Sequence, residues 1–137
     1  MAVRYPDWTA RWARALAARR RGAFAWGVRD CVTFTGEMAE ALTGSNPLAF
    51  VRGRYADETE AWTLLESLGG AERMLTGALG TPVPAPLACR GDVVLVAMRE
   101  GMWAAAFAVC DGEYAVSVGA RGLVRVPMTS ALKAWRV

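Results

Sequence analysis

A proline-rich connector divides this chain into two halves with different hydrophobic patterns, and that division constrains the fold most. Residues 81–86 contain three prolines, and proline fixes φ and lacks the backbone N–H that helices and sheets use. Before the connector, apolar residues recur at helical spacing; after residue 91, apolar runs alternate with turn signals. The sequence therefore predicts an α+β domain in which N-terminal helices pack on a C-terminal antiparallel β-meander of about four strands.

Length and composition favour one globular domain. The chain has 137 residues, of which 54% are hydrophobic and 21% are charged, and this length suits one domain with a buried core. We interpret residues 1–137 as a single domain, with a helical part over about 5–80 and a strand part over about 90–137. No apolar run approaches the roughly 18 residues of a membrane-spanning helix, and residues 1–7 lack the pattern of a secretory signal.

Four helices are predicted in the first half from cap residues and glycines. They are a helix between Asp7 and Gly22, a helix over residues 31–42 closed by Gly44, a helix capped by Asp57 with Glu60 at the capping-box position, and a helix over residues 71–79. Residues 50–55 are expected to form a loop between the second and third helices.

Four strands and a last short helix are predicted in the second half. The strands are expected at residues 92–98, 103–110, 113–118 and 123–126, with a turn at 99–101. Asp111-Gly112 is a strong hairpin signal between the second and third strands. Thr129 can cap a final helix that holds Leu132 and Trp135.

The first predicted helix is basic on its outer sides. It carries arginines at positions 11, 14 and 19–21, away from an apolar face that includes Trp8 and Trp12. Such a helix could lie on nucleic acid or on an anionic membrane surface, or it could dock on the protein with its charges in solvent. The net charge is only +3, so we expect the docked helix, no nucleic-acid partner and no membrane span.

The pair Asp30-Cys31 opens the second helix and carries the main chemical signal. Asp30 is a natural N-cap, because its carboxylate can accept backbone N–H groups of the first turn. Cys31 then lies where the helix dipole favours a thiolate and lowers a cysteine pKa, whereas the negative charge of Asp30 acts in the opposite sense. The position fits a nucleophilic cysteine, and it also fits a small buried apolar residue, the more common role of a free cysteine.

The chain contains no histidine. A cysteine nucleophile needs a base to take its proton, and an imidazole base cannot come from this chain. A carboxylate such as Asp111 or Glu113 could substitute if burial raised its pKa, and a partner protein could supply a histidine.

The three cysteines lack the spacing of a zinc site or of a disulfide framework. Cys31, Cys89 and Cys110 could still meet in space and hold a metal or an iron–sulfur cluster with a further ligand. Widely spaced cysteines are more often core residues, and we therefore expect no metal and no cofactor.

The order of these elements resembles the NlpC-type cysteine peptidase-like family, which has a papain-like fold. In that family an Asp-Cys pair opens a helix that packs on an antiparallel sheet, and the first strand follows a Gly-Asp pair. The corresponding residues here are Asp30-Cys31 and Gly91-Asp92. The family places a histidine at the start of the next strand, which corresponds to Ala104 or Ala105 when the hairpin is aligned on Asp111-Gly112. The resemblance thus implies that Cys31 is a vestigial nucleophile without its base.

The chain is more similar still to a largely phage- and prophage-encoded branch of that family. The shared elements are Trp-Gly-x-x-Asp-Cys at 26–31, Thr-Gly at 43–44, Arg-Gly-x-Tyr at 52–55, Gly-Asp at 91–92 and Ala-Trp at 134–135. Within them, Trp26, Arg52, Arg54 and Tyr55 are the candidate binding residues. The two arginines could hold an acidic partner or a phosphate, although such a loop is more often solvated.

Proteins of that branch are typically associated with the tail tip of tailed phages, beside the hub and distal tail proteins. The resemblance therefore implies a virion component made in the bacterial cytoplasm. We hypothesise a structural or adaptor piece with a catalytically degenerate peptidase-like fold. The alternatives are a peptidase or amidase that acts on peptidoglycan with a non-histidine or partner-supplied base, and a tail component that binds a metal or an iron–sulfur cluster.

Overall fold

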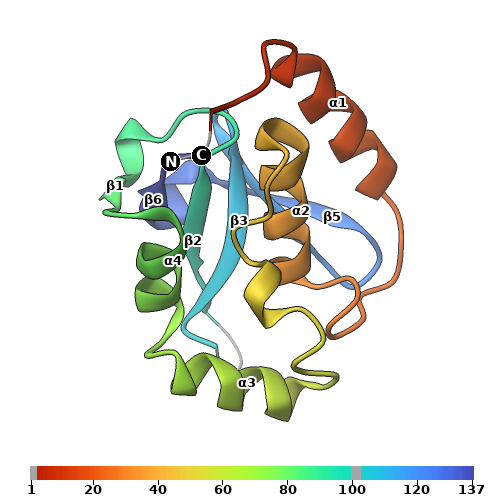
Figure 1. Ribbon diagram of the computed structural model, residues 1–137, viewed down its shortest axis with the longest axis vertical. Coiled ribbons are helices and arrows are strands. Elements are labelled where there is room, and N and C mark those ends of the chain that lie inside the picture. Colours follow the sequence, from red (N-terminus) through yellow and green to blue (C-terminus); the bar gives the residue numbers. More distant parts are fainter. Residues whose placement is uncertain (1–2, 100–102) are drawn as a thin grey trace.

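The computed structural model describes residues 3–99 and 103–137 and has the α+β architecture that the sequence predicts (Figure 1). Its helices are α1 (Trp8–Arg19), α2 (Cys31–Thr43), α3 (Glu58–Ser67) and α4 (Ala71–Leu79), with short 3₁₀ helices η1 (Ala49–Val51), η2 (Ala85–Leu87) and η3 (Met128–Ser130). Its strands are β1 (Val83–Pro84), β2 (Val93–Ala97), β3 (Ala105–Asp111), β4 (Tyr114–Val118), β5 (Leu123–Pro127) and β6 (Ala131–Trp135). Within these described ranges, no helix combines the length and the apolar composition that crossing a membrane requires.

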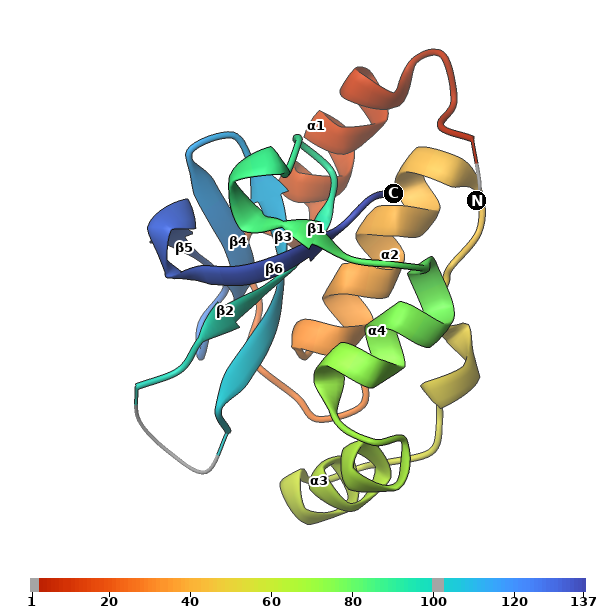
Figure 2. The same ribbon diagram turned by 90° about the vertical axis from the view of Figure 1, so that its left-hand side faces the viewer.

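The strands form one antiparallel sheet in the order β1-β6-β2-β3-β4-β5. The strands β2 to β5 form the expected meander, and the hairpin at Asp111-Gly112 is confirmed because Asp111 pairs with Tyr114. β6 then returns across the sheet and pairs with β2 on one side and with β1 on the other (Figure 2). The sheet thus has six strands in the described part of the chain, where about four were predicted.

The helices α1, α2 and α4 lie on one face of this sheet (Figures 1 and 2). α2 packs on β3 and β4, and α1 packs beside α2 on the same face. The core on this face has two clusters, one between the first turn of α2, α3, α4 and the central strands, and the other between α1, α2, β3 and β4. Trp12 and Ala15 of α1 are buried in the second cluster, which confirms the docked amphipathic helix.

The final helix predicted after Thr129 is wrong, because Ala131–Trp135 forms strand β6. Residues spaced by three lie on one side of a helix but on opposite faces of a strand, and here Leu132 is 56% exposed whereas Trp135 is 0% exposed. β2 is buried along most of its length, and its buried backbone groups need partners along both edges. β6 supplies one of those edges, so tertiary pairing overrides the local spacing.

Smaller differences concern the ends of elements. Asp7 is at the N-cap of α1, but its carboxylate pairs with Arg11 at 2.8 Å instead of capping the backbone. α1 ends at Arg19, ahead of Gly22. The connector at 81–86 is only partly extended, since it contains β1 and the start of η2, and the predicted loop at 50–55 begins within η1. The turn expected at 99–101 falls largely outside the described residues.

Other boundaries follow the prediction. Gly44 closes α2 in the left-handed conformation, with φ of 82°, a region that glycine enters without steric penalty. Asp57 caps α3 by accepting the backbone N–H of Glu60, while the Glu60 side chain accepts the N–H of Ala56 rather than that of Asp57. The fourth helix spans the predicted residues.

The buried carboxylate of Asp92 ties the two ends of the described chain to the start of β2. Asp92 Oδ1 accepts the backbone N–H of Val137 at 3.1 Å and pairs with the guanidinium of Arg4 at 3.2 Å. Its other oxygen accepts the N–H of Cys89 at 2.9 Å. Arg4 also donates to the backbone oxygens of Val137 and Arg90 at 2.7 and 2.8 Å. Because a charge buried without partners is costly, these contacts hold four segments in one arrangement.

Replacement of Trp135 tests whether β6 is an integral part of the core. Trp135 packs in the core cluster under α4, and its indole N–H donates to Thr76 Oγ1 at 3.2 Å. We expect Trp135→Ala to lower the free energy of unfolding by about 3–5 kcal/mol, because it leaves a large cavity. Leu132→Ala on the same strand should change it by less than about 0.5 kcal/mol. Urea denaturation measures both, and equal effects would contradict the assigned strand.

Candidate functional site

The N-terminus of α2 is fixed by a reciprocal cap. Asp30 Oδ1 accepts the backbone N–H of Thr33 at 2.8 Å, and Thr33 Oγ1 accepts the backbone N–H of Asp30 at 2.9 Å. This capping box satisfies two backbone groups that the helix leaves unpaired. The prediction that Asp30 caps this helix is confirmed.

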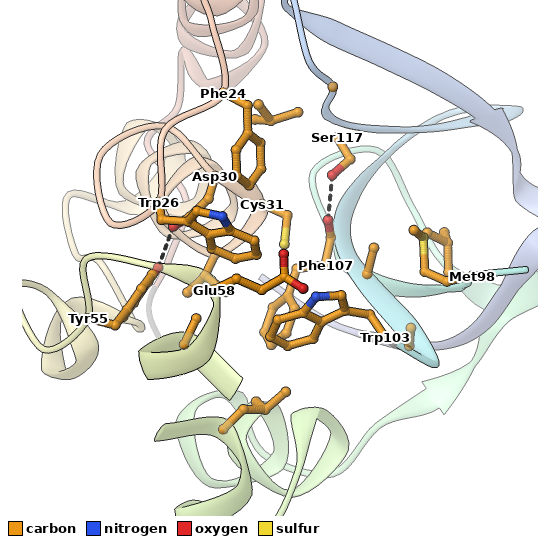
Figure 3. Close-up of a pocket in the computed structure, with 18 of the residues that line it drawn as sticks. Phe24, Trp26, Asp30, Cys31, Tyr55, Glu58, Met98, Trp103, Phe107 and Ser117 are labelled. Carbon is orange, nitrogen blue, oxygen red and sulfur yellow. Dashed lines mark hydrogen bonds between the residues drawn. The ribbon is translucent and has the colours of Figure 1, made fainter. Parts of the chain in front are cut away.

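The second oxygen of Asp30 connects the cap to two loops. Asp30 is 1% exposed, and its Oδ2 accepts the N–H of Gly27 at 2.8 Å and the hydroxyl of Tyr55 at 2.7 Å (Figure 3). Gly27 has φ of 78°, and a Cβ there would lie 2.5 Å from the backbone oxygen of Tyr55, so only glycine fits. One carboxylate therefore holds the segment before α2, the first turn of α2 and the loop that ends at Tyr55.

Cys31 follows this cap and faces the core cluster that contains Phe107. The residue is half-buried, but protein atoms closely surround its thiol. Burial raises the pKa of the Cys31 thiol to about 11; the backbone N–H of Phe107 lowers the pKa and the Asp30 carboxylate raises it further. Of the opposing effects that the sequence suggests, the helix dipole is thus outweighed, because removal from water raises the pKa of the thiol.

Tyr55 is held as a neutral donor. Burial raises the pKa of its phenol well above the ordinary value, and the hydrogen bond to Asp30 and the charge of Asp30 act in the same direction. A neutral phenol can donate to the carboxylate, whereas a phenolate would repel it. The Tyr55 phenol therefore remains a hydrogen-bond donor throughout the physiological pH range.

A largely apolar cavity of about 450 Å³ lies beside Cys31 (Figure 3). Its walls come from the segment before α2, the first turn of α2, α3, the ends of β2 and β3, and the region around the β4–β5 turn. Trp26 and Trp103 stack with ring centroids 5.7 Å apart, Phe24 meets Trp26 edge-on at 4.8 Å, and Trp62 meets Trp103 edge-on at 5.1 Å. A concave apolar site of this volume with few polar groups is typical of small-molecule pockets.

The structure gathers some of the predicted site residues and separates others. Trp26, Asp30, Cys31, Tyr55 and Ala105 all line the cavity. By contrast, Ala104 is exposed and lies outside the cavity lining. Of the two candidate positions for the missing histidine, Ala105 is thus the one that shares a cavity with the thiol.

Arg52 and Arg54 point away from this site. Both are exposed, and within the described residues neither side chain makes a hydrogen bond or an ion pair, nor does either line the cavity. The structure thus brings together the aromatic residues of the two loops and leaves their arginines in solvent.

The two carboxylates considered as substitute bases are in the wrong place. Asp111 pairs with Arg90 at 3.0 Å and accepts the indole N–H of Trp12 at 3.1 Å, and Glu113 is exposed in the β3–β4 turn. Neither lines the cavity beside Cys31. The carboxylate that does is Glu58, which sequence reasoning missed because it follows Asp57 and resembles an ordinary acidic residue in the first turn of a helix.

The three cysteines do not meet. Cys31 packs with the cluster on the helix-covered face, whereas Cys110 is buried on the opposite face of the sheet and Cys89 is exposed. In the described part of the chain, no three histidine, cysteine, aspartate or glutamate residues are grouped to hold a metal ion. The alternative in which these three cysteines meet to hold a metal or an iron–sulfur cluster is therefore wrong.

Fold and site together define an α+β domain in which a buried carboxylate caps a cysteine-bearing helix beside an aromatic cavity. Residues 3–137 match the model of a protein family described as a domain of unknown function, DUF6950. Because the match spans nearly the whole chain, the protein belongs to this family. No curated protein and no solved structure matches the chain.

Removal of the Tyr55 hydroxyl tests the Asp30 contact. We expect Tyr55→Phe to lower the free energy of unfolding by about 1.5–3 kcal/mol, since it leaves a buried carboxylate oxygen with one donor fewer. Tyr114→Phe is the matched control, because Tyr114 is 43% exposed and loses only a solvated hydroxyl. Thermal or urea unfolding measures the difference, and equal stability of the two variants would contradict a structural role for the contact.

Proposed function

We propose that this protein is a structural or adaptor component of a phage tail tip, built on an NlpC-type peptidase-like domain that no longer hydrolyses peptides. The proposal joins two kinds of support. The chemistry of the site argues against hydrolysis, and the resemblance of the motifs to the phage-encoded branch suggests the place of assembly.

The state of Cys31 is the observation that carries the proposal. At a pKa of about 11, only about one thiol in a thousand is ionised at pH 8, and the thiolate is the form that attacks a carbonyl. The chain has no histidine to take the proton, and general-base assistance contributes roughly 10²–10⁴-fold to such reactions. An alanine, Ala105, lines the cavity where the resemblance would put the imidazole.

The arrangement of elements supports the peptidase-like interpretation. A helix with cysteine in its first turn packs on an antiparallel sheet whose β2 follows Gly91-Asp92, in the order that the resemblance implies. A fold can persist after its chemistry is lost. The remaining features, a reciprocal helix cap and a six-stranded sheet in the described residues, suit a building block.

A second candidate function is supported by Glu58. This carboxylate lines the same cavity as Cys31, and a carboxylate can act as a general base when it is placed within reach of the thiol proton. In that case the protein would be a cysteine peptidase or amidase that acts on peptidoglycan without an imidazole. The burial of the thiol favours the non-catalytic proposal.

Alkylation of Cys31 tests the loss of the base. We expect Cys31 to react slowly with iodoacetamide at pH 8. The alkylation rate should rise about tenfold per pH unit up to about pH 10, because the thiolate fraction rises about tenfold per unit below the pKa. Mass spectrometry follows each cysteine, with the exposed Cys89 as reference in the same sample. Ala105→His should raise the Cys31 rate at pH 8 by about tenfold or more, since an adjacent imidazolium stabilises the thiolate.

Ala104→His is the matched control for that experiment. Its histidine would be in solvent, and the Cys31 rate should stay unchanged. A wild-type rate that is already independent of pH above pH 7 would contradict the inert thiol. Equal rates in the two histidine variants would contradict the assignment of Ala105 as the vacant base position.

Digestion of peptidoglycan tests the proposed function as a whole. We expect the purified protein to release no more soluble fragments than Cys31→Ala does, and we expect the protein to co-purify with hub and distal tail proteins in assembled tails. Release that depends on Cys31 and is lost in Glu58→Gln would overturn the proposal in favour of the second candidate. Absence of the protein from purified tails would overturn the assembly role.

A further inference from the structure

The cavity beside Cys31 has nearly all of its polar lining groups occupied by the protein itself. Asp30 accepts from Gly27, Thr33 and Tyr55. The hydroxyl of Ser117 donates to the backbone oxygen of Phe107 at 2.7 Å. The thiol of Cys31 is neutral at physiological pH, and the Asp30 carboxylate is already paired with three protein donors.

Glu58 is the exception. It lines the cavity but is an exposed residue, so it lies at the rim. Within the described residues, its carboxylate has no hydrogen bond and no ion pair. Among the described residues, Asp30 and Glu58 are the charged ones that line the cavity, and of these two it is Glu58 whose carboxylate has no protein partner.

The rim beside Glu58 is aromatic. Glu58 lines the cavity together with Trp26 and Trp103 (Figure 3), and the indoles of these two tryptophans stack with ring centroids 5.7 Å apart. Indole faces attract cations through their quadrupole, most strongly where the cation is partly desolvated. A cavity lining that carries a carboxylate and two indoles therefore favours a positively charged nitrogen over a neutral or an anionic group.

The deeper walls specify the rest of the ligand. They consist of aliphatic and aromatic side chains, including Leu64, Leu65, Met74 and Phe107, which gain free energy by covering apolar surface of a ligand. A volume of about 450 Å³ accommodates a body of the size of a substituted phenyl ring or a medium alkyl chain.

We propose that this cavity binds a small amphiphilic amine, with its apolar body in the cavity and its ammonium group against Glu58 and the indoles of Trp26 and Trp103. The binding is non-covalent and leaves Cys31 unmodified. The inference does not rest on the proposed tail role or on the loss of hydrolysis, because it uses only the shape and charge of the cavity.

Three probes with the same apolar body and different head groups test the proposal. They are 4-phenylbutylamine, 4-phenylbutanol and 4-phenylbutyrate, and their binding to the full chain is measured at pH 7 by calorimetry and by tryptophan fluorescence. We expect the amine to bind roughly tenfold more tightly than the alcohol, from the combined cation–π and charge contributions. The butyrate should bind most weakly, because its charge opposes that of Glu58.

Two variants locate the site. Glu58→Gln should lower the affinity for the amine to about that for the alcohol and leave the affinity for the alcohol unchanged. Glu66→Gln, at an exposed position of the same helix, should leave the affinities for all three probes unchanged. Ala105→Phe places a ring in the empty space of the cavity and should weaken all three probes together. Circular dichroism verifies that each variant is folded.

The outcomes separate clearly. Binding of no probe by the wild-type protein would overturn the proposal, as would equal binding of all three probes. A preference for the amine that persists in Glu58→Gln would also overturn it, because the charge would then lie elsewhere. Since the readout is affinity alone, peptidoglycan hydrolysis or absence from tails would contradict the proposed function without affecting this test.

Discussion

One buried carboxylate, Asp30, organises the part of the molecule that contains the cavity. The Asp30 carboxylate accepts three hydrogen bonds, from Gly27, Thr33 and Tyr55, and the Asp30 backbone N–H donates a fourth to Thr33 Oγ1. Removing an aspartate from water is unfavourable unless donors replace that water. The segments that carry Trp26 and Tyr55 are thereby fixed relative to α2, and the wall of the cavity depends on that fixation. Asp92 performs a similar task at the start of β2, where it joins the ends of the described chain.

The same arrangement explains why the Cys31 thiol stays protonated. The cap puts Cys31 at a helix start, where a dipole favours ionisation, but it also puts a carboxylate beside the thiol and closes apolar side chains around it. Burial is the largest of these effects and leaves the thiol protonated. An imidazole at Ala105 would change that balance, whereas the proposed binding of an amine at Glu58 and the aromatic rim needs no thiolate.

Local signals predicted the helical half well and the sheet only in part. Asp30, Gly44 and Asp57 act through neighbours within four residues, so their roles can be read from short patterns. β6 and β1 depend on partners 35 to 51 residues away, and no local pattern reports such pairing. The site was predicted in its loop residues, since Trp26, Asp30, Cys31 and Tyr55 do converge. Glu58 was missed, and Asp111 misplaced, because cavity lining is a property of packing between elements.

The insertion of β6 between β1 and β2 has a consequence for biosynthesis. β2, β3, β4 and β5 can form their meander as they leave the ribosome, but the outer edge of β2 stays uncovered until β6 has emerged. An apolar strand with unpaired backbone groups is a template for association with other chains. Synthesis of β6 thus covers the exposed edge of β2. A translation product that stalls or ends before β6 would keep this edge unpaired and would be a substrate for chaperones.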